Sequence, residues 1–393
     1  MRIVILKTNV IYCGDCQKIL RQHIPDNSID LIYADPPFFT EKKYEVIWGD
    51  GYEIRAYEDR WKGGIQNYLA WMEPKLRECQ RVLKQTGSMY LHCDYHANAH
   101  LRILMDKIFE EKNFQNEVIW WYHTGGASKV RFARSHDTLL FYTKGDKWTF
   151  NWEELKYSRT EKALKRARNP KGARISITDV YKVPEDVLEI QQMNPMAKER
   201  VGYPTQKPEA LLEAIIKASS NPMDIILDPF CGCGTAIAVA HKLGRRWIGI
   251  DVSPTACKLM FKRMQKLNPS LRLEETVIGL PKTVEELRTL QPFEFQNWVI
   301  QKLGARVSER KIGDMGIDGF TFDLKPIQVK QSDNVGRNVV DNFETAMRRV
   351  NAKRGIIVAF SFGKGAYEEV ARAKLQEGLE IELITVEELI KLP

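Results

Sequence analysis

The amino-acid sequence predicts an α/β protein of two units, a doubly wound parallel sheet followed by a smaller α/β unit. Short apolar runs alternate with amphipathic helical patterns over residues 1–120, and the same rhythm returns over 205–267. Another series of helices and strands begins after Pro292 and fills about one hundred residues, an ordinary size for a domain. Strands that alternate with helices are typical of a parallel sheet with helices on both faces.

The composition is ordinary for a soluble globular protein. Of the 393 residues, 44% are hydrophobic and 28% are charged. The sequence contains no run of roughly eighteen apolar residues, which argues against a membrane span, and its start lacks the apolar core and cleavage site of a secretory signal. The seven cysteines are therefore expected to be reduced thiols in a cytoplasmic protein. The net charge of +8 suits a polyanionic partner without establishing one.

The first unit is expected over residues 1–267, with strands and helices in alternation. Apolar runs predict strands over 28–34, 87–93, 224–228 and 246–251, and amphipathic patterns predict helices over 68–83, 211–220, 234–244 and 253–267. Asn268 and Pro269 are expected to stop the last helix.

Two stretches interrupt this order. Residues 123–204 are polar, basic and aromatic with weak periodicity, so we interpret them as an insertion that serves recognition and not the core. Residues 268–288 are expected to be a linker, in which Thr283 and Glu286 have the spacing of a capping box at the start of a short helix.

The second unit is expected over residues 289–393. Its pattern predicts a helix over 293–304, strands over 319–324 and 327–331, a helix over 339–353, a strand over 355–360, a helix over 366–378 and a strand over 381–386. This is the order of a compact α/β unit that buries its own core.

The sharpest local pattern is Asp35-Pro36-Pro37-Phe38, directly after a predicted strand. An acid at the end of a sheet strand lies where open α/β sheets bind ligands, and the two prolines stiffen the turn. The amine of adenine or cytosine is a poor nucleophile because its lone pair is delocalised into the ring. A carboxylate and a backbone carbonyl that accept its two N–H groups would free that lone pair, and an aromatic ring can stack on the extruded base. The alternative is a proline-rich turn with Asp35 as a helix cap.

A second pattern, DPFCGCGT at residues 228–235, stands between a predicted strand and a predicted helix. Its glycines allow a tight turn close to a ligand, and a helix N-terminus favours a carboxylate. Asp251 ends the next strand, where it is placed to accept hydrogen bonds from ribose hydroxyls. The chain has no G-x-G-x-x-G fingerprint after a strand, which disfavours a dinucleotide cofactor, and no P-loop, which excludes a P-loop ATPase.

Together these patterns resemble the DNA amino-methyltransferases of the β permutation, in which the catalytic loop precedes the cofactor loop. The resemblance covers roughly residues 9–267 and rests on three segments in the order of that family, at 35–38, 205–208 (TQKP) and 228–235. It implies a Rossmann-like doubly wound fold, S-adenosylmethionine as cofactor and double-stranded DNA as substrate, with transfer of a methyl group to a flipped base amine. The aspartate at the head of the catalytic loop favours adenine N6 over cytosine N4.

The resemblance also implies a role for each matching residue. The target amine would be held and activated by Asp35, Pro36, Pro37 and Phe38. The cofactor would be bound by Asp15 near its adenine, Asp251 at its ribose, Thr205 and Lys207 over its methionine end, and, around its methionine part, Asp228, Pro229, Phe230, Gly232, Gly234 and Thr235. Cys231 and Cys233 replace small residues that are common in the family, without an expected change in the shape of the loop.

A strongly basic segment lies inside the predicted insertion. Residues 156–174 carry eight basic residues against one acid, Glu161, and aromatic residues flank the segment at Trp148, Phe150, Trp152 and Tyr157. A solvated helix face is the alternative, but so one-sided a strip is suited to neutralising phosphates. We therefore expect DNA contact here.

Two further groups of residues are not interpreted as metal sites, and for the histidines among them structural or DNA-side roles are favoured. Cys13 and Cys16 form a C-x-x-C pair, but no second pair stands at zinc-finger spacing, which disfavours a metal or redox site. His92, His96 and His100 have helical spacing, yet His92 lies at the end of a strand, so the three are not expected to share a face.

In the second unit, the candidate chemistry lies in Asp318, Gln328 and Lys330, with Glu294 on the preceding helix. Strand alternation places Gln328 and Lys330 on one face. A carboxylate and an amide oxygen can ligate Mg²⁺, so Asp318, Gln328 and Glu294 are the predicted metal ligands, and Lys330 could orient the attacking water.

This region resembles the Mrr-like branch of the PD-(D/E)XK restriction endonucleases. The shared features are the segment 302–320, the Gln328-Val329-Lys330 triplet and the order of helices and strands over 292–391. Gln328 in place of a second acid is a pattern of that branch, although it removes one negative charge and lowers the expected metal affinity.

The sequence therefore predicts a bifunctional restriction–modification enzyme of prokaryotic or viral origin, in which one unit methylates a short DNA sequence and the other cuts DNA. One alternative is a solitary methyltransferase whose C-terminal unit only binds DNA, and another is a DNA-binding protein that has lost both activities. The sequence leaves open a homodimer.

Overall fold

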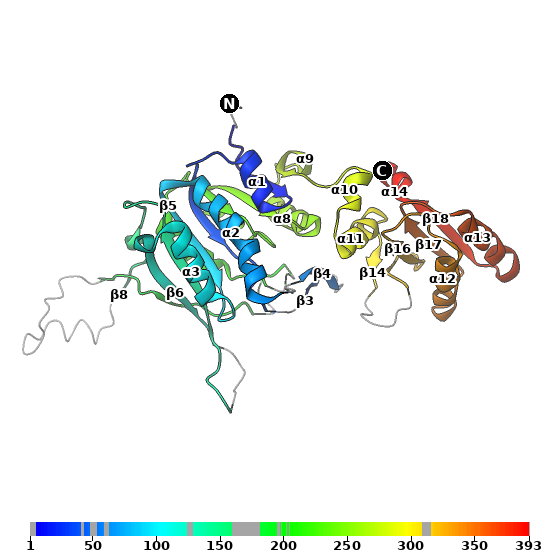
Figure 1. The fold of residues 1–393 in the computed structure, drawn as a ribbon, viewed down its shortest axis with the longest axis horizontal. Helices are drawn as coiled ribbons and strands as arrows, with labels where there is room; N and C mark the ends of the chain where they lie inside the picture. Colours follow the sequence, from blue (N-terminus) through cyan, green and yellow to red (C-terminus); the bar gives the residue numbers. More distant parts are fainter. Residues whose placement is uncertain are drawn as a thin grey trace, which may run out of the picture.

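A computed structural model describes residues 5–40, 43–47, 53–58, 63–123, 129–158, 181–194, 197, 199–201, 203, 205–308 and 316–392. These residues fold into two α/β units that lie side by side along the longest axis of the molecule (Figure 1). None of the helices in these ranges is long and apolar enough to cross a membrane.

The first unit is built on a nine-stranded sheet with the order β10-β6-β7-β5-β2-β11-β12-β1-β13. Neighbouring strands are parallel except at β7, which runs antiparallel to both β5 and β6. The bounds are β1 (Val10–Cys13), β2 (Ile29–Ala34), β5 (Leu83–Cys93), β6 (Phe114–Trp121), β7 (His136–Thr143), β10 (Val187–Glu189), β11 (Ile225–Asp228), β12 (Arg246–Asp251) and β13 (Val277–Ile278).

Helices cover both faces of this sheet, which confirms the predicted doubly wound fold. One face carries α1 (Cys16–His23), α2 (Gly64–Val82) and α3 (Asn98–Phe109), and the other carries α6 (Glu209–Ser219), α7 (Thr235–Lys242) and α8 (Pro254–Leu267). Side chains alternate between the two cores: in β2, Ile32 and Ala34 join the first core, and Leu31 and Tyr33 join the second. Burial on both faces explains why these strands read as continuous apolar runs.

The path of the chain places two loops side by side at the centre of the sheet. After β2 the chain moves outward to β5, and it later returns to place β11 and β12 between β2 and β1. β2 and β11 pair in parallel, with Leu31 opposite Ile226. The loops that follow these strands, at Asp35 and at Asp228, therefore leave the same edge of the sheet. Such a reversal of strand order is where open α/β sheets bind ligands.

The prediction that residues 123–204 lie outside the core is wrong for residues 136–143. They form β7, in which Leu139 to Tyr142 are buried within the two cores of the large sheet. Because both faces of β7 are covered, its apolar residues form a continuous run without the alternation of a half-buried strand. The rest of the described segment consists of loops and of α4 (Trp152–Leu155), β8 (Tyr157–Ser158), β9 (Tyr181–Lys182) and β10.

The large sheet continues into the segment expected to be a linker. α8 ends at Leu267 with Asn268 as its C-cap, as predicted. α9 (Leu273–Thr276) then leads into β13, which pairs with β1 at the edge of the sheet. α10 (Val284–Arg288) follows with the predicted capping box of Thr283 and Glu286. Since Leu287 of α10 is buried in the core of the second unit, that unit begins at α10.

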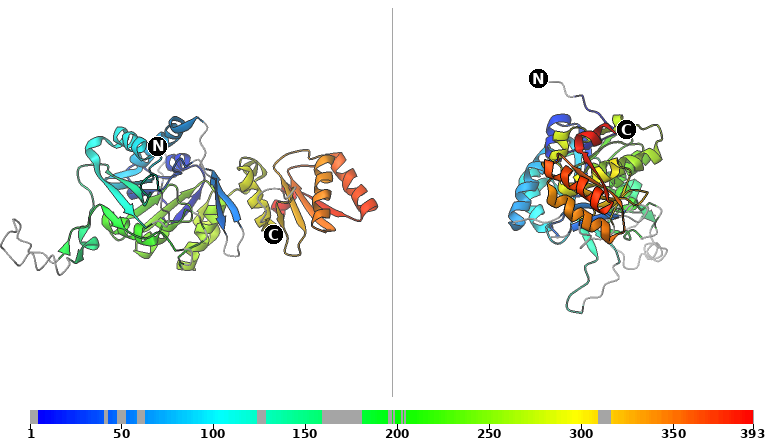
Figure 2. Two further views of the ribbon diagram at one scale, coloured as in Figure 1. Left: turned by 90° about the horizontal axis from the view of Figure 1, so that it is seen from below. Right: turned by 90° about the vertical axis from the view of Figure 1, so that its right-hand side faces the viewer.

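The second unit has a five-stranded sheet with the order β14-β15-β16-β17-β18. α11 and α14 pack on one face, and α12 and α13 pack on the other. The side with α11 faces the first unit (Figures 1 and 2). The bounds are α11 (Pro292–Lys302), β14 (Arg306–Val307), β15 (Gly319–Phe320), β16 (Pro326–Lys330), α12 (Arg337–Arg349), β17 (Arg354–Ala359), α13 (Lys364–Glu377), β18 (Glu380–Thr385) and α14 (Val386–Lys391).

A hairpin of β3 (Lys43–Ile47) and β4 (Glu53–Glu58) follows the loop at Asp35. The backbone of β4 lies against α11, so the second unit touches the first both at α8 and at this hairpin.

Candidate functional site

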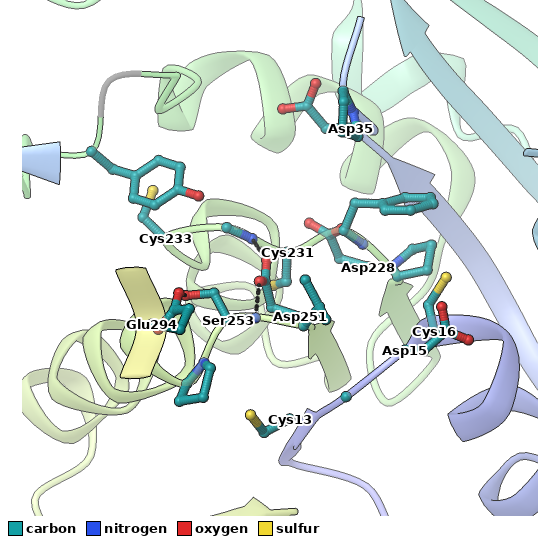
Figure 3. A pocket seen from close by; sticks show the side chains of 18 of the residues that line it. Cys13, Asp15, Cys16, Asp35, Asp228, Cys231, Cys233, Asp251, Ser253 and Glu294 are labelled. Atoms are coloured by element: carbon teal, nitrogen blue, oxygen red, sulfur yellow. Dashed lines mark hydrogen bonds between the residues drawn. The ribbon is translucent and has the colours of Figure 1, made fainter. Parts of the chain in front are cut away.

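A cavity of about 960 Å³ opens where the loops after β2 and β11 leave the sheet. Its walls include Asp35 from the first loop, Asp228 and Gly232 from the second, and Asp251 from the end of β12. Figure 3 shows the three acids arranged around one space. The volume is at the upper end of the range of small-molecule and cofactor sites. The two loops that the sequence singled out therefore open into the same cavity.

The loop after β11 is shaped by glycines. Gly232 and Gly234 have φ values of 53° and 79°, which residues with a side chain rarely adopt. A Cβ at Gly234 would lie 2.9 Å from Cγ of Met260, so that a side chain has no room there. The buried Asp228 accepts a hydrogen bond from the backbone N of Phe230 at 3.0 Å and thereby holds the turn. The loop ends at the start of α7, where the first backbone N–H groups have no partner within the helix, and Thr235 and Ala236 of this first turn line the cavity.

Asp251 connects the glycine loop to the start of α8. Its Oδ2 accepts from the backbone N of Gly232 at 2.8 Å, and its Oδ1 accepts from the backbone N of Ser253 at 2.9 Å. Burial raises the pKa of Asp251 to about 6, although these hydrogen bonds oppose the rise. Asp15 lines another part of the cavity and caps α1 by accepting from the backbone N of Lys18 at 3.1 Å. All of the predicted cofactor residues except Gly234 line this cavity.

The structure pairs Asp35 with Lys207, from a distant part of the chain. The Nζ atom of Lys207 lies 2.9 Å from Oδ1 and 2.7 Å from Oδ2 of Asp35, and both side chains are largely buried. The same ammonium group lies 4.8 Å from the centre of the Phe38 ring. Two charge-assisted hydrogen bonds hold the carboxylate in one orientation. The sequence placed Lys207 near the cofactor but did not indicate this contact.

Buried polar side chains form a layer behind Asp35. The Nδ1 atom of His92, in β5, lies 2.8 Å from Oη of Tyr33 and 3.8 Å from Oδ1 of Asp35, and its Nε2 lies 3.3 Å from Oδ2 of Asp137. Although burial alone would raise the pKa of Asp137, hydrogen bonds from His92 and Tyr122 hold it below its ordinary value. The sequence interpretation gave His92 a structural or DNA-side role; its position within an apolar strand was the signal that could have placed it behind Asp35.

A second constellation lies where β15 meets β16. The Oδ2 atom of Asp318 accepts from the backbone N of Val329 at 2.7 Å, so this carboxylate lies beside the strand that carries Gln328 and Lys330. Gln328 is buried, and its Oε1 has no hydrogen-bond partner within the described part of the chain. Gly316 packs over the amide, since a Cβ there would lie 2.4 Å from Nε2 of Gln328. A buried amide oxygen without a partner is costly unless a ligand completes it.

Family profiles match both units. One, described as a DNA methylase of the N6/N4 type, matches residues 29–262, and another, described as a restriction endonuclease of the Mrr type, matches residues 287–393. The chain belongs to the N6/N4 DNA methylase family. It is a fusion of a methylase unit with an Mrr-type nuclease unit, as the sequence indicated.

Relatives of the methylase unit are type II DNA methyltransferases and similar enzymes. The type II methyltransferase M.HinfI of Haemophilus influenzae is 32% identical over 272 residues, which is 67% of this chain and 70% of that protein. The DNA adenine methyltransferase YhdJ of Escherichia coli K12 is 33% identical over 264 residues, 66% of this chain and 83% of that protein. The solved PvuII DNA methyltransferase, cytosine-N4-specific, has a TM-score of 0.48 and 18% identity, covering 69% of this chain and 90% of that one.

Glu294 does not lie in the nuclease site, so its prediction as a metal ligand is wrong. It begins α11 and points into the methylase unit, where it accepts hydrogen bonds from the hydroxyl groups of Ser253 and Thr255, the latter at 2.9 Å. It also lines the cavity of the methylase unit (Figure 3). The residue of α11 that faces the nuclease site is Gln296, whose Nε2 donates to the backbone O of Asp318 at 3.4 Å. Side chains two positions apart on a helix point in directions about 200° apart, so Glu294 and Gln296 face opposite sides of α11.

The buried Glu294 makes the contact between the units dependent on pH. Burial raises its pKa to about 7 from an ordinary value of 4.5, and the two hydroxyl hydrogen bonds oppose this rise. Between these values the folded protein holds a proton that the unfolded chain releases, so the stability contributed by this group falls as the pH rises through this window. Relative to Glu294→Gln, the wild-type protein should lose up to about 3 kcal/mol between pH 5 and pH 8. Thermal unfolding of both proteins over this range measures the difference, and parallel profiles would contradict it.

Other sequence interpretations have mixed outcomes. Most of the basic segment at 156–174 lies outside the described residues. Cys13 and Cys16 are both buried free thiols, and burial raises the pKa of Cys16 to about 12, which keeps it protonated and unreactive. The three histidines do not share a face, because His92 lies in β5 and His100 in α3.

One group of three carboxylates in the nuclease unit, Asp341, Glu344 and Glu369, has oxygen atoms within 4.8 Å of one another. Arg372 pairs with Glu344 at 2.7 Å and also contacts Glu369, and Arg337 pairs with Glu369 at 2.8 Å. The two guanidinium groups offset two of the three negative charges, so we interpret the cluster as part of an ion-pair network between α12 and α13.

Proposed function

We propose that the methylase unit transfers a methyl group from S-adenosylmethionine to the N6 amine of a flipped adenine at a specific site in double-stranded DNA, and that the nuclease unit cuts DNA with Mg²⁺. The observation that supports methyl transfer most directly is the single cavity shared by the loops at Asp35 and Asp228. A donor held by one loop is then within reach of an amine held by the other, and such positioning supplies much of the rate of a two-substrate reaction.

The side chains of the cavity fit S-adenosylmethionine. Its carboxylate suits the N–H groups at the start of α7, where the helix dipole favours negative charge. Its ribose hydroxyls suit Asp251, which is mostly ionised at neutral pH because its pKa is about 6. Its sulfonium charge suits a cavity lined by several acids. When bound, it supplies an electrophilic methyl group.

The loop after β2 has the groups that activate an amine. Asp35 would accept one N–H of the target base, and a backbone carbonyl of the rigid loop would accept the other. Tyr68 already donates to the carbonyl of Pro37 at 2.8 Å, which leaves that of Pro36 for the substrate. The Phe38 ring lies against His92, with ring centres 5.3 Å apart, and offers a stacking surface for the extruded base.

The choice of adenine rests on the aspartate at the head of the loop, and it agrees with the relative YhdJ, which is named as a DNA adenine methyltransferase. DNA incubated with the protein and S-adenosylmethionine, then digested to nucleosides, should contain N6-methyladenine by mass spectrometry. N4-methylcytosine instead would overturn the choice of base alone. If DNA of mixed sequence yields no methylated nucleoside at all, the proposed methyl transfer is overturned.

The donors of the nuclease site fit Mg²⁺. The Oε1 atom of Gln328, which has no partner among the described residues, and the carboxylate of Asp318 are oxygen ligands of the kind that this ion takes. When bound, the ion polarises the phosphate and activates water. Ile327 and Val329 pack towards α11, so Gln328 and Lys330 face the other side of the strand together. We infer that the protein is a bifunctional restriction–modification enzyme; methylation without any Mg²⁺-dependent cutting would reduce it to a methyltransferase whose second unit binds DNA.

A further inference from the structure

The cavity of the methylase unit is closed on one side by the nuclease unit. Gln291, Pro292, Phe293 and Glu294, at the start of α11, line it together with residues of the two methylase loops. Neither family profile joins the units in one site, since the first match ends at residue 262 and the second begins at 287. The cavity proposed for the cofactor is therefore incomplete without α11.

Glu294 makes a buried contact between the units. It is 4% exposed, and its two carboxylate oxygens accept from the hydroxyl groups of Ser253 and Thr255 at the start of α8. Ser253 is the N-cap of this helix of 14 residues and also accepts from the backbone N of Ala256 at 3.0 Å. A carboxylate at a helix N-terminus is favourably placed with respect to the helix dipole. Between the same two helices, α8 and α11, Nζ of Lys258 donates to Oε1 of Gln301 at 3.0 Å.

This contact continues to the acid expected to bind ribose. Ser253 donates through its backbone N to Asp251, and Asp251 in turn accepts from the backbone N of Gly232 in the glycine loop. Glu294, Ser253, Asp251 and Gly232 therefore form one chain of hydrogen bonds from the nuclease unit to the floor of the cavity (Figure 3). A substitution at Glu294 can therefore shift Asp251 through these hydrogen bonds.

We propose that Glu294 of the nuclease unit is a positioning residue of the cofactor site, which sets the affinity for S-adenosylmethionine by holding Ser253 and Thr255 of the methylase unit. This inference rests on the proposed function. Binding free energies are linked reciprocally, so a cofactor that binds the docked arrangement more tightly also stabilises the docking of the nuclease unit by the same factor.

Titration calorimetry of the full chain with S-adenosylmethionine tests the proposal. Glu294→Ala removes the acceptor of two buried hydroxyls and should raise the Kd roughly tenfold, whereas Glu294→Gln, which keeps an acceptor and the shape, should have a smaller effect. Glu387→Ala, which removes an exposed glutamate of α14 in the same unit, is the matched control and should leave the Kd unchanged.

Thr255→Val provides the sharper variant, because Thr255 is not among the residues that line the cavity. It removes only the hydroxyl that donates to Glu294, and we expect the Kd to rise about threefold. In the Glu294→Ala background it should add no further change, since the acceptor is already gone. At saturating cofactor the turnover number should stay near the wild-type value while the KM for S-adenosylmethionine rises, because neither residue touches the reacting atoms.

The outcomes are distinguishable. Suppose that the wild-type protein binds S-adenosylmethionine and that Glu294→Ala, Glu294→Gln and Thr255→Val all have the wild-type Kd. This result would overturn the present proposal and leave the proposed function intact. Additive effects of the two substitutions would overturn it as well. No binding of S-adenosylmethionine by the wild-type protein would overturn both. If Glu294→Ala does not fold, Thr255→Val and Glu294→Gln decide the question.

Discussion

Replacing Asp35 with alanine is expected to reduce methyl transfer to DNA by about a thousandfold or more, the order of magnitude lost with a positioned acid–base group. The carboxylate is the group proposed to accept the N–H of the target amine, and Lys207 holds it in one orientation. Affinity for S-adenosylmethionine should stay nearly unchanged, because the groups proposed to bind its ribose and carboxylate, Asp251 and the start of α7, lie on other loops. Incorporation of labelled methyl groups and titration calorimetry measure the two quantities.

Controls separate chemistry from stability in this experiment. Asp35→Ala also leaves the largely buried ammonium group of Lys207 without its carboxylate, so thermal unfolding should be measured alongside. Asp35→Asn keeps the shape and removes the charge, and it should be nearly as inactive. Asp26→Ala, an exposed aspartate just before β2, should retain full activity. Loss of cofactor binding in a folded Asp35→Asn protein would refute the assignment of this loop to the substrate.

The second large expected effect is on DNA cutting by the nuclease unit, after substitution of Lys330. Lys330→Ala should reduce Mg²⁺-dependent cutting of unmethylated DNA by about a hundredfold or more, because it removes the cation proposed to stabilise the charge that develops on the phosphate. Methylation by the same protein should be unaffected, since Lys330 lies on β16, away from the cavity of the methylase unit. A plasmid-cutting assay and a methylation assay on one preparation compare the two activities.

Lys325→Ala is the matched control for this substitution. Lys325 lies just before the same strand and pairs with Asp323 on the surface, at 2.9 Å. Its removal should leave cutting unchanged, and a loss equal to that of Lys330→Ala would indicate a general loss of positive charge for DNA binding. If the wild-type protein does not cut unmodified DNA with Mg²⁺ present, the nuclease assignment fails.

Local patterns in the sequence predicted most of the fold. The glycine loop, the proline loop and the capping box at Thr283 depend on residues close together in the chain, and each takes the expected form. Strand β7 was missed for a physical reason, because a strand covered on both faces has no alternation to distinguish it from other apolar runs.

The contacts that complete the two sites depend on residues distant in the chain. The pairing of Lys207 with Asp35 joins segments 172 residues apart, and no local pattern indicates it. The direction of Glu294 follows from which surface each side of α11 packs against. One side of that helix meets the nuclease sheet, and the other meets α8. Residue type alone therefore could not show which of Glu294 and Gln296 faces the predicted nuclease site.

The hydrogen bonds of Glu294 also limit how such a fusion can be recombined. Ser253 and Thr255 are 6% and 5% exposed, and among the described residues the acceptor of both hydroxyl groups is Glu294 of the other half. A nuclease half exchanged for one with an apolar residue at this position would leave two donors buried and unsatisfied. We expect that an exchange of this half is tolerated only if Ser253 and Thr255 change with it, so Glu294, Ser253 and Thr255 should be inherited together in such fusions.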